Sequence, residues 1–335
     1  MRVSVLDQSP VKSNATPAES IRESLDLAKA CESFGYHRYW LSEHHNSPAL
    51  AGSSPEILIA AIAATTSRIR VGAAGIMLPH YSAYKVSEQF RTLEAIAPGR
   101  IDLGLGRAPG SDGHTAMALN PNAARGVDNF PAQVRDVWAW TAGAELPPDH
   151  PFRTLIANPE GATAPELWIL GSSNYGAELA AWFGLPYCFA WFFSDGEGGA
   201  EAIATYRKHF RPSSVLAEPH CAIVVWALAA PTYKEAEYWY RPRGLFSLMR
   251  SRGHFIPLPT PEEVAATNLT PTDLDRLAEF RKRAFVGTGP EVATRLQQLA
   301  QTLHIDELVI TTGTSNVEAR VNSYRLLAEA FGLTG

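Results

Sequence analysis

The sequence is poor in cysteine and has no long apolar run. It contains three cysteines, Cys31, Cys188 and Cys221, which are far apart and lie in apolar stretches. An odd, dispersed set of thiols indicates neither a disulfide framework nor a zinc site, and it favours a reduced, cytoplasmic chain. The longest apolar runs, residues 57–64 and 221–230, are much shorter than the ~20 residues that a membrane span requires.

An excess of positive charge is also missing. Lys and Arg number 29 against 34 Asp and Glu, which gives a net charge of -5. Because nucleic-acid binding by phosphate neutralisation normally needs a basic face, we expect no nucleic-acid partner. Residues 1–7 alternate and soon reach an acid, which predicts a strand rather than a signal peptide. Hydrophobic residues make up 46% of the chain, enough for a large core, so we expect a globular protein without a membrane partner.

Short apolar runs alternate with amphipathic helices along the whole chain. The pattern predicts eight strands, at residues 3–7, 38–42, 69–76, 101–105, 167–170, 186–190, 220–229 and 308–311. It predicts helices at residues 17–34, 55–66, 83–97, 123–140, 175–183, 199–210, 291–303 and 317–331. Such alternation is typical of a doubly wound sheet or of a closed (β/α)8 barrel. Eight units without a linker favour an α/β chain that forms one TIM barrel domain over residues 1–335.

Two segments depart from this rhythm. Residues 107–122 form a polar insertion after the fourth predicted strand. Residues 241–283 lie between the seventh and eighth strands. This segment begins with Arg241, Arg243, Arg250 and Arg252 and continues with a proline-rich spacer and an acidic–basic helix. Because a simple connection needs fewer residues, this insertion is either an extra pair of surface helices or a lid over the barrel mouth.

A TIM barrel carries its functional site at the carboxyl ends of its strands. Gly171, Ser172 and Ser173 follow the fifth strand and open a helix, where backbone N–H groups favour a phosphate. Arg107 follows the fourth strand and can add a charge-assisted contact to the same group. The alternatives are that the serines only cap the helix and that Arg107 forms a surface ion pair.

The ends of the second and third strands supply further candidates. His44 is a polar residue at a strand end, and Glu43 is its candidate partner. No two of the ten histidines are separated by a single residue, so the sequence predicts no metal site of the barrel-hydrolase kind. Glycine and alanine replace branched residues at 72–75, which permits either a β-bulge against a planar ligand or tight packing. Asp102 is a further polar residue, within the fourth strand, and a structural ion pair is an equal explanation for it.

Taken together, these residues resemble the luciferase-like family of flavin-dependent monooxygenases. The matching segments are residues 40–45, 69–79, 98–110, 170–173, 183–186 and 286–288. The resemblance implies a (β/α)8 barrel that binds FMN, a mobile lid at residues 241–272 and a homodimer. It also implies that a separate flavin reductase supplies reduced FMN, which forms a flavin peroxide and oxygenates a small organic substrate such as an aldehyde or an aromatic ring.

The resemblance assigns roles to individual residues. His44 takes the position of the family's catalytic histidine, as general base or proton shuttle, with Glu43 beside it. Ala74 and Gly75 match the family's non-prolyl cis peptide against the flavin ring.

The same likeness places Arg107, Ser172 and Ser173 on the phosphate-binding positions, next to Gly171. One departure concerns Trp191, which stands where close relatives often have a histidine, so we expect a reshaped substrate pocket. Two other functions stay open: a deazaflavin-dependent hydride-transfer oxidoreductase and a flavin-binding protein without turnover.

Overall fold

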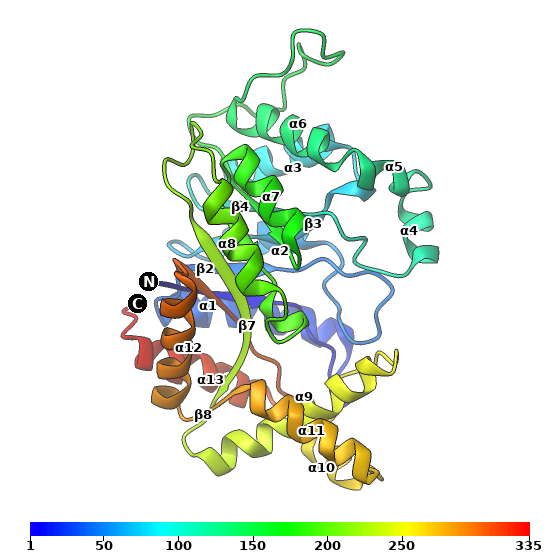
Figure 1. Ribbon diagram of the computed structural model, residues 1–335, viewed down its shortest axis with the longest axis vertical. Coiled ribbons are helices and arrows are strands. Elements are labelled where there is room, and N and C mark those ends of the chain that lie inside the picture. Colours follow the sequence, from blue (N-terminus) through cyan, green and yellow to red (C-terminus); the bar gives the residue numbers. More distant parts are fainter.

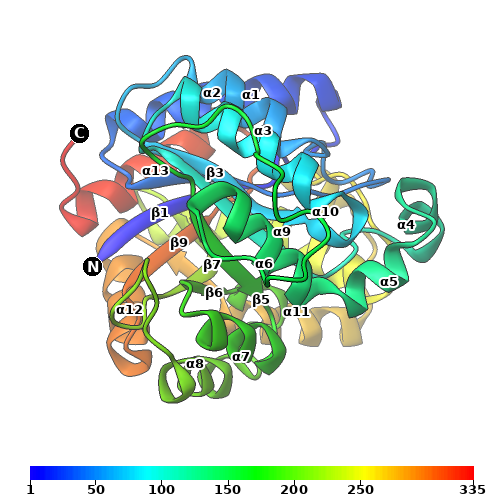
Figure 2. The same cartoon turned by 90° about the horizontal axis from the view of Figure 1, so that it is seen from above.

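A closed barrel of parallel strands forms the centre of the molecule, and helices surround it (Figures 1 and 2). The computed structural model describes residues 1–335 apart from the side chain of Ala123. The barrel strands are β1 (Arg2–Asp7), β2 (Arg38–Leu41), β3 (Arg70–Met77), β4 (Ile101–Gly106), β5 (Glu166–Gly171), β6 (Tyr187–Phe189), β7 (Cys221–Ala229) and β9 (Glu307–Thr311). Strand β9 pairs with both β7 and β1, which closes the ring. The predicted TIM barrel is confirmed.

Amphipathic helices cover the outside of this barrel. They are α1 (Pro17–Ser33), α2 (Pro55–Ala63), α3 (Ala83–Ile96), α6 (Phe130–Ala142), α7 (Asn174–Phe183), α8 (Gly199–His209), α12 (Gly289–Leu303) and α13 (Val317–Phe331). Local sequence sets their ends: at α1, Thr16 accepts from the backbone N–H of Glu19 and the Glu19 side chain accepts in return. This reciprocal pair satisfies N–H groups that a helix start leaves free. No described helix is long and apolar enough to cross a membrane.

Apolar side chains pack in separate regions on the two sides of the strands. One large cluster lies between the strands and the helices. A second fills the barrel and consists of Leu6, Trp40, Trp168, Cys188, Phe192, Ala222, Val224 and Val309. Trp40 and Trp168 meet edge to face in it, with ring centres 5.0 Å apart. Because successive strand residues point to opposite faces, each strand contributes to both regions.

The amino-terminal end of the barrel holds a buried ionic cluster around Arg38. The fully buried guanidinium of Arg38 lies 3.0 Å from Asp102, 3.1 Å from Glu166 and 2.9 Å from Glu307. Arg70 also pairs with Asp102. Three of these residues are the first of β2, β5 and β9, so the cluster lies opposite the carboxyl ends of the strands. Asp102 is therefore a structural member of an ion-pair network.

The segment between β4 and β5 differs from its prediction. The polar insertion contains α4 (Gly113–Leu119), which Asp112 caps by accepting from the backbone N–H of Thr115 at 2.9 Å. The helix predicted at residues 123–140 is divided into α5 (Ala123–Asp128) and α6, with Asn129 between them. The physical reason is Pro131, whose ring and missing N–H are tolerated in a first helical turn but not in a helix interior.

The insertion after β7 begins earlier than residue 241. It comprises α9 (Tyr233–Ser251), α10 (Pro261–Ala266), α11 (Pro271–Arg283) and the short strand β8 (Phe285–Gly287). Figure 1 shows the three helices gathered at one end of the molecule, and β8 pairs with the end of β7. Helix α9 thus starts eight residues before the predicted insertion at 241–283, and Pro242 lies inside it.

Candidate active site

A cavity of about 200 Å³, which we call the mouth cavity, opens at the carboxyl ends of the strands. Its lining includes seven of the eight predicted site residues, namely His44, Ala74, Gly75, Arg107, Gly171, Ser172 and Ser173. The structure thus brings together side chains and backbone from four different strand ends. The carboxylate of Glu43 is not part of the described lining.

The start of α7 forms one corner of the mouth cavity. Ser173 is its N-cap residue, yet its side chain makes no capping hydrogen bond to the helix. Ser172 and Ser173 are both exposed, so their hydroxyls face the open space. A Cβ on Gly171 would lie 3.2 Å from the hydroxyl oxygen of Tyr187, which shows how closely the strand–helix turn is packed. The capping alternative does not apply to Ser173, and the first-turn N–H groups of α7 remain available to an anion.

Arg107 lies against the same corner. Its guanidinium carbon stacks 3.7 Å from the centre of the Tyr175 ring, in the first turn of α7. Among the described residues no carboxylate forms an ion pair with Arg107, so the surface ion-pair alternative is not realised. An aromatic face orients a guanidinium while leaving its N–H donors in the plane free. We call Arg107, Ser172, Ser173 and the start of α7 the phosphate corner, because this donor set fits a phosphate group.

Strand β3 forms the adjoining wall. The peptide bond between Ala74 and Gly75 is cis, as the family resemblance implies. The register of β3 against β4 shifts between Ala73 and Ile76, which confirms the predicted β-bulge. A Cβ on Gly75 would come within 2.3 Å of Leu170 Cδ1 and 2.7 Å of the Gly104 carbonyl oxygen. Only glycine fits there, and the backbone of residues 74 and 75 borders the mouth cavity.

His44 contributes an imidazole to the mouth cavity. Its Nδ1 lies 3.1 Å from the Ser42 hydroxyl, and its backbone N–H donates to the carbonyl of Gly52 at 2.9 Å. Burial and the positive charge of Arg250 lower the pKa of His44 to about 4, against the opposing effect of Glu43. The ring is therefore neutral near pH 7. The low pKa also makes this imidazole a weaker base than an ordinary histidine.

Glu43 is oriented away from the mouth cavity. Its carboxylate is 1% exposed and accepts from the backbone N–H of Met77 at 2.9 Å and from the Tyr81 hydroxyl at 2.6 Å. Its remaining partner is His45 at 2.7 Å, so Glu43 pairs with His45 and not with His44. These contacts tie the end of β2 to the segment after β3, which is a positioning role.

Comparison with known proteins decides the family. The model of the luciferase-like monooxygenase family matches residues 1–306. The chain belongs to this family. The protein YwcH of Bacillus subtilis is 44% identical over 98% of both chains. The N-acetyl-S-alkylcysteine monooxygenase of the same organism is 35% identical over 98% of both chains.

Solved structures agree with this membership of the luciferase-like family. The crystal structure of apo-MsnO8 superposes with a TM-score of 0.89 at 36% identity and 99% coverage of both chains. A Pseudomonas putida 3,6-diketocamphane monooxygenase component in complex with FMN has a TM-score of 0.73 at 19% identity, covering 98% of this chain and 97% of that one. An F420-dependent secondary alcohol dehydrogenase has a TM-score of 0.68 at 13% identity, covering 100% and 99%. These last two share the fold.

The luciferase-like chain also contains site residues that the sequence did not indicate. Tyr175 orients Arg107, and Ser42 contacts His44. A hydroxyl two residues before a histidine and an aromatic ring in a helix start are too common to stand out in one sequence. Among the described residues, no group of three or more His, Cys, Asp or Glu side chains could hold a metal ion.

Proposed function

We propose that the protein is an FMN-dependent monooxygenase that uses reduced FMN and oxygen to oxygenate a small organic substrate. The observation that carries this proposal is the phosphate corner, where Arg107 and the uncapped start of α7 face one cavity. Membership of the luciferase-like monooxygenases supports it.

Each predicted site residue has a physical task in this proposal. Arg107, Ser172 and Ser173 hold the FMN phosphate by charge-assisted hydrogen bonds. The backbone of Ala74 and Gly75 supports the flavin ring. When bound, reduced FMN supplies the electrons and the oxygen-activating chemistry.

His44 acts as the proton acceptor of the site. In the tautomer whose Nδ1–H donates to the Ser42 hydroxyl oxygen, Nε2 of the neutral ring has a free lone pair and can accept a proton. Glu43 acts through position only, since its hydrogen bonds hold the segments on either side of His44.

Partners complete the proposal. The sequence contains no dinucleotide fingerprint, so a separate flavin reductase supplies reduced FMN. A homodimer is proposed through α2, on which the apolar side chain of Ile57 is 66% exposed. Light scattering of the purified protein checks the dimer.

The decisive experiment is an anaerobic titration with reduced FMN and, separately, with reduced deazaflavin F420, which a distant barrel of this fold binds. The complex is then mixed rapidly with oxygen. We expect tight binding of reduced FMN, weak or no binding of F420, and a return to the oxidised flavin spectrum that is slower than for free FMN. Tighter binding of F420, or oxidation at the rate of the free flavin, would reject the proposal. The Arg107→Met variant is the matched control for binding through the phosphate.

A further inference from the structure

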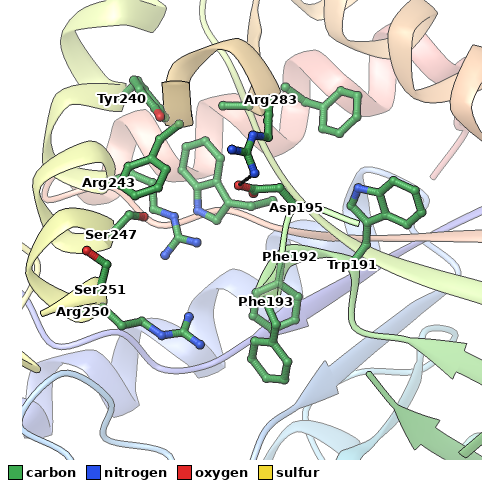
Figure 3. Close-up of a pocket in the computed structure, with 14 residues that line it drawn as sticks. Trp191, Phe192, Phe193, Asp195, Tyr240, Arg243, Ser247, Arg250, Ser251 and Arg283 are labelled. Carbon is green, nitrogen blue, oxygen red and sulfur yellow. Dashed lines mark ion pairs between the residues drawn. The ribbon is translucent and has the colours of Figure 1, made fainter. Parts of the chain in front are cut away.

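A second cavity of about 230 Å³ adjoins the mouth cavity (Figure 3). The two cavities share Phe192 and Phe193, which follow β6. The opposite wall of the second cavity comes from α9 and α11 of the insertion. We call it the arginine cavity, because Arg243, Arg250 and Arg283 line it.

One face of α9 presents polar side chains to this space. Arg243, Ser247, Arg250 and Ser251 follow one another at intervals that place them on the same side of a helix. Figure 3 shows the guanidinium groups of Arg243 and Arg250 extending from α9 into the open space, on the side that faces Phe193. Both groups lie among aromatic rings, since Arg243 is 5.5 Å from the centre of Trp226 and Arg250 is 5.4 Å from that of Phe193.

The charges of the arginine cavity do not balance. Its lining contains a single carboxylate, Asp195, and this lies 3.8 Å from Arg283. Neither Arg243 nor Arg250 forms an ion pair with any carboxylate in the described chain. Two positive charges of the lining are therefore uncompensated, next to a largely aromatic surface.

Partly burying two positive charges without a negatively charged partner costs free energy. Burial and the charge of Arg250 lower the pKa of Arg243 to about 10, and burial also lowers the pKa of Arg250. Two like charges in such surroundings are stabilised by an anion that both can bind. A guanidinium pair matches the planar geometry of a carboxylate.

We propose that the arginine cavity is the substrate site and that the substrate is an organic acid. Its carboxylate binds to Arg243 and Arg250, its apolar body packs between Trp226 and Phe193, and its oxidisable end points past Phe192 into the mouth cavity. This inference rests on the proposed flavin function, of which it specifies the substrate class. The neutral aldehyde or aromatic ring that the family resemblance implies would leave both charges unused.

The two cavities are also electrostatically connected. Arg250 is among the causes of the lowered pKa of His44, so its guanidinium acts on the imidazole from the neighbouring cavity. A carboxylate bound to Arg250 therefore lies near the base of the mouth cavity. This places the substrate within reach of the proposed chemistry.

The test compares two probes of nearly equal shape, phenylacetate and phenylacetamide, which differ in charge. Binding to the full chain, with and without FMN, is measured by calorimetry and by quenching of tryptophan fluorescence at low ionic strength. We expect phenylacetate to bind at least ~10-fold more tightly, because each charge-assisted hydrogen bond is worth about 1.5–3 kcal/mol and 1.4 kcal/mol is tenfold.

Variants assign the preference to individual residues. Arg243→Met and Arg250→Met should each remove about tenfold or more of the phenylacetate affinity and leave that of phenylacetamide within about twofold. Arg250→Lys should retain part of the preference, since it keeps the charge. Arg241→Met is the matched control, because Arg241 is exposed on the same helix and does not line the cavity. Thermal melting confirms that each variant is folded.

Three results would overturn the inference. These are equal affinities for the two probes, a preference that persists in both Met variants, and competition by inorganic phosphate as strong as that of phenylacetate itself. The experiment also separates this inference from the proposed function. Binding of FMN without a preference for the acid rejects the inference alone, whereas a preference for the acid without FMN binding rejects the flavin function and keeps the acid site.

Discussion

The phosphate corner makes a quantitative prediction about cofactor choice. FMN and riboflavin differ only in the phosphate, so the ratio of their dissociation constants isolates the contacts of that group. Arg107 stacks on Tyr175 and forms no ion pair with a described residue, so replacing it by methionine leaves no carboxylate without a partner. The loss therefore reflects the missing phosphate contact, at about 1.5–3 kcal/mol. We expect Arg107→Met to weaken FMN binding by about 10- to 150-fold and riboflavin binding by less than about twofold.

The serine hydroxyls should contribute less to the free energy of FMN binding than Arg107 does. A hydrogen bond from a neutral hydroxyl contributes about 0.5–1.5 kcal/mol, so Ser172→Ala should weaken FMN binding by about two- to tenfold. Titration of flavin fluorescence with the protein measures the dissociation constants of FMN and riboflavin for the native chain and each variant, at one fixed salt concentration. Arg153→Met is the control, since Arg153 is exposed and lies outside the described lining of the mouth cavity. Equal affinity of the native protein for FMN and riboflavin, or an equal loss of both in Arg107→Met, would refute the reasoning.

Three other expectations concern the electrostatics of the fold. His44 should titrate near pH 4 in an NMR experiment. Arg250→Met should raise this pKa, but not to the value of an ordinary histidine, because burial is the larger cause. An unchanged pKa in this variant would contradict the electrostatic connection between the two cavities. Burial opposes ionisation of Glu307, but His220 and Arg38 outweigh it and lower its pKa to about 2. Since the unfolded carboxyl protonates near pH 4.5 and the folded one only near pH 2, Glu307 stabilises the fold above pH 5, and about 3 kcal/mol is lost as the pH falls to 2. Urea unfolding at pH 6 and pH 3 measures this, and equal stability at both values would exclude it. Arg38→Met should cost about 3–5 kcal/mol, because it leaves buried carboxylates unpaired, whereas the exposed control Arg2→Met should change stability by less than about 0.5 kcal/mol.

Much of the barrel and its site could be predicted from the sequence. Strand positions follow from short apolar runs, and a TIM barrel places the loops after all its strands at one end. For that reason the sequence alone assigned residues as distant as His44, Arg107 and Ser172 to one site, and all three line the mouth cavity. The small residues of β3 likewise indicated the bulge at Gly75.

Other features depend on tertiary contacts that no local pattern records. The partner of Glu43 was wrongly predicted to be His44, because the choice between adjacent histidines depends on Tyr81 and Met77, which pack against the carboxylate. The sequence pattern predicted no helix at residues 233–251, where α9 lies with Pro242 in its interior. The arginines of this segment are evident in the sequence. That Arg243 and Arg250 lie on one face follows only from the observed course of α9.

The ionic cluster around Arg38 has a consequence for the entry and release of ligands. Charged groups occupy the far end of the barrel, and Trp40 and Trp168 fill the space above them. Cofactor, substrate and product must then all enter and leave through the carboxyl end of the barrel. A carboxylic acid bound between α9 and Phe193 would lie in that opening. The larger flavin would therefore have to bind first, and the acid would then close the opening.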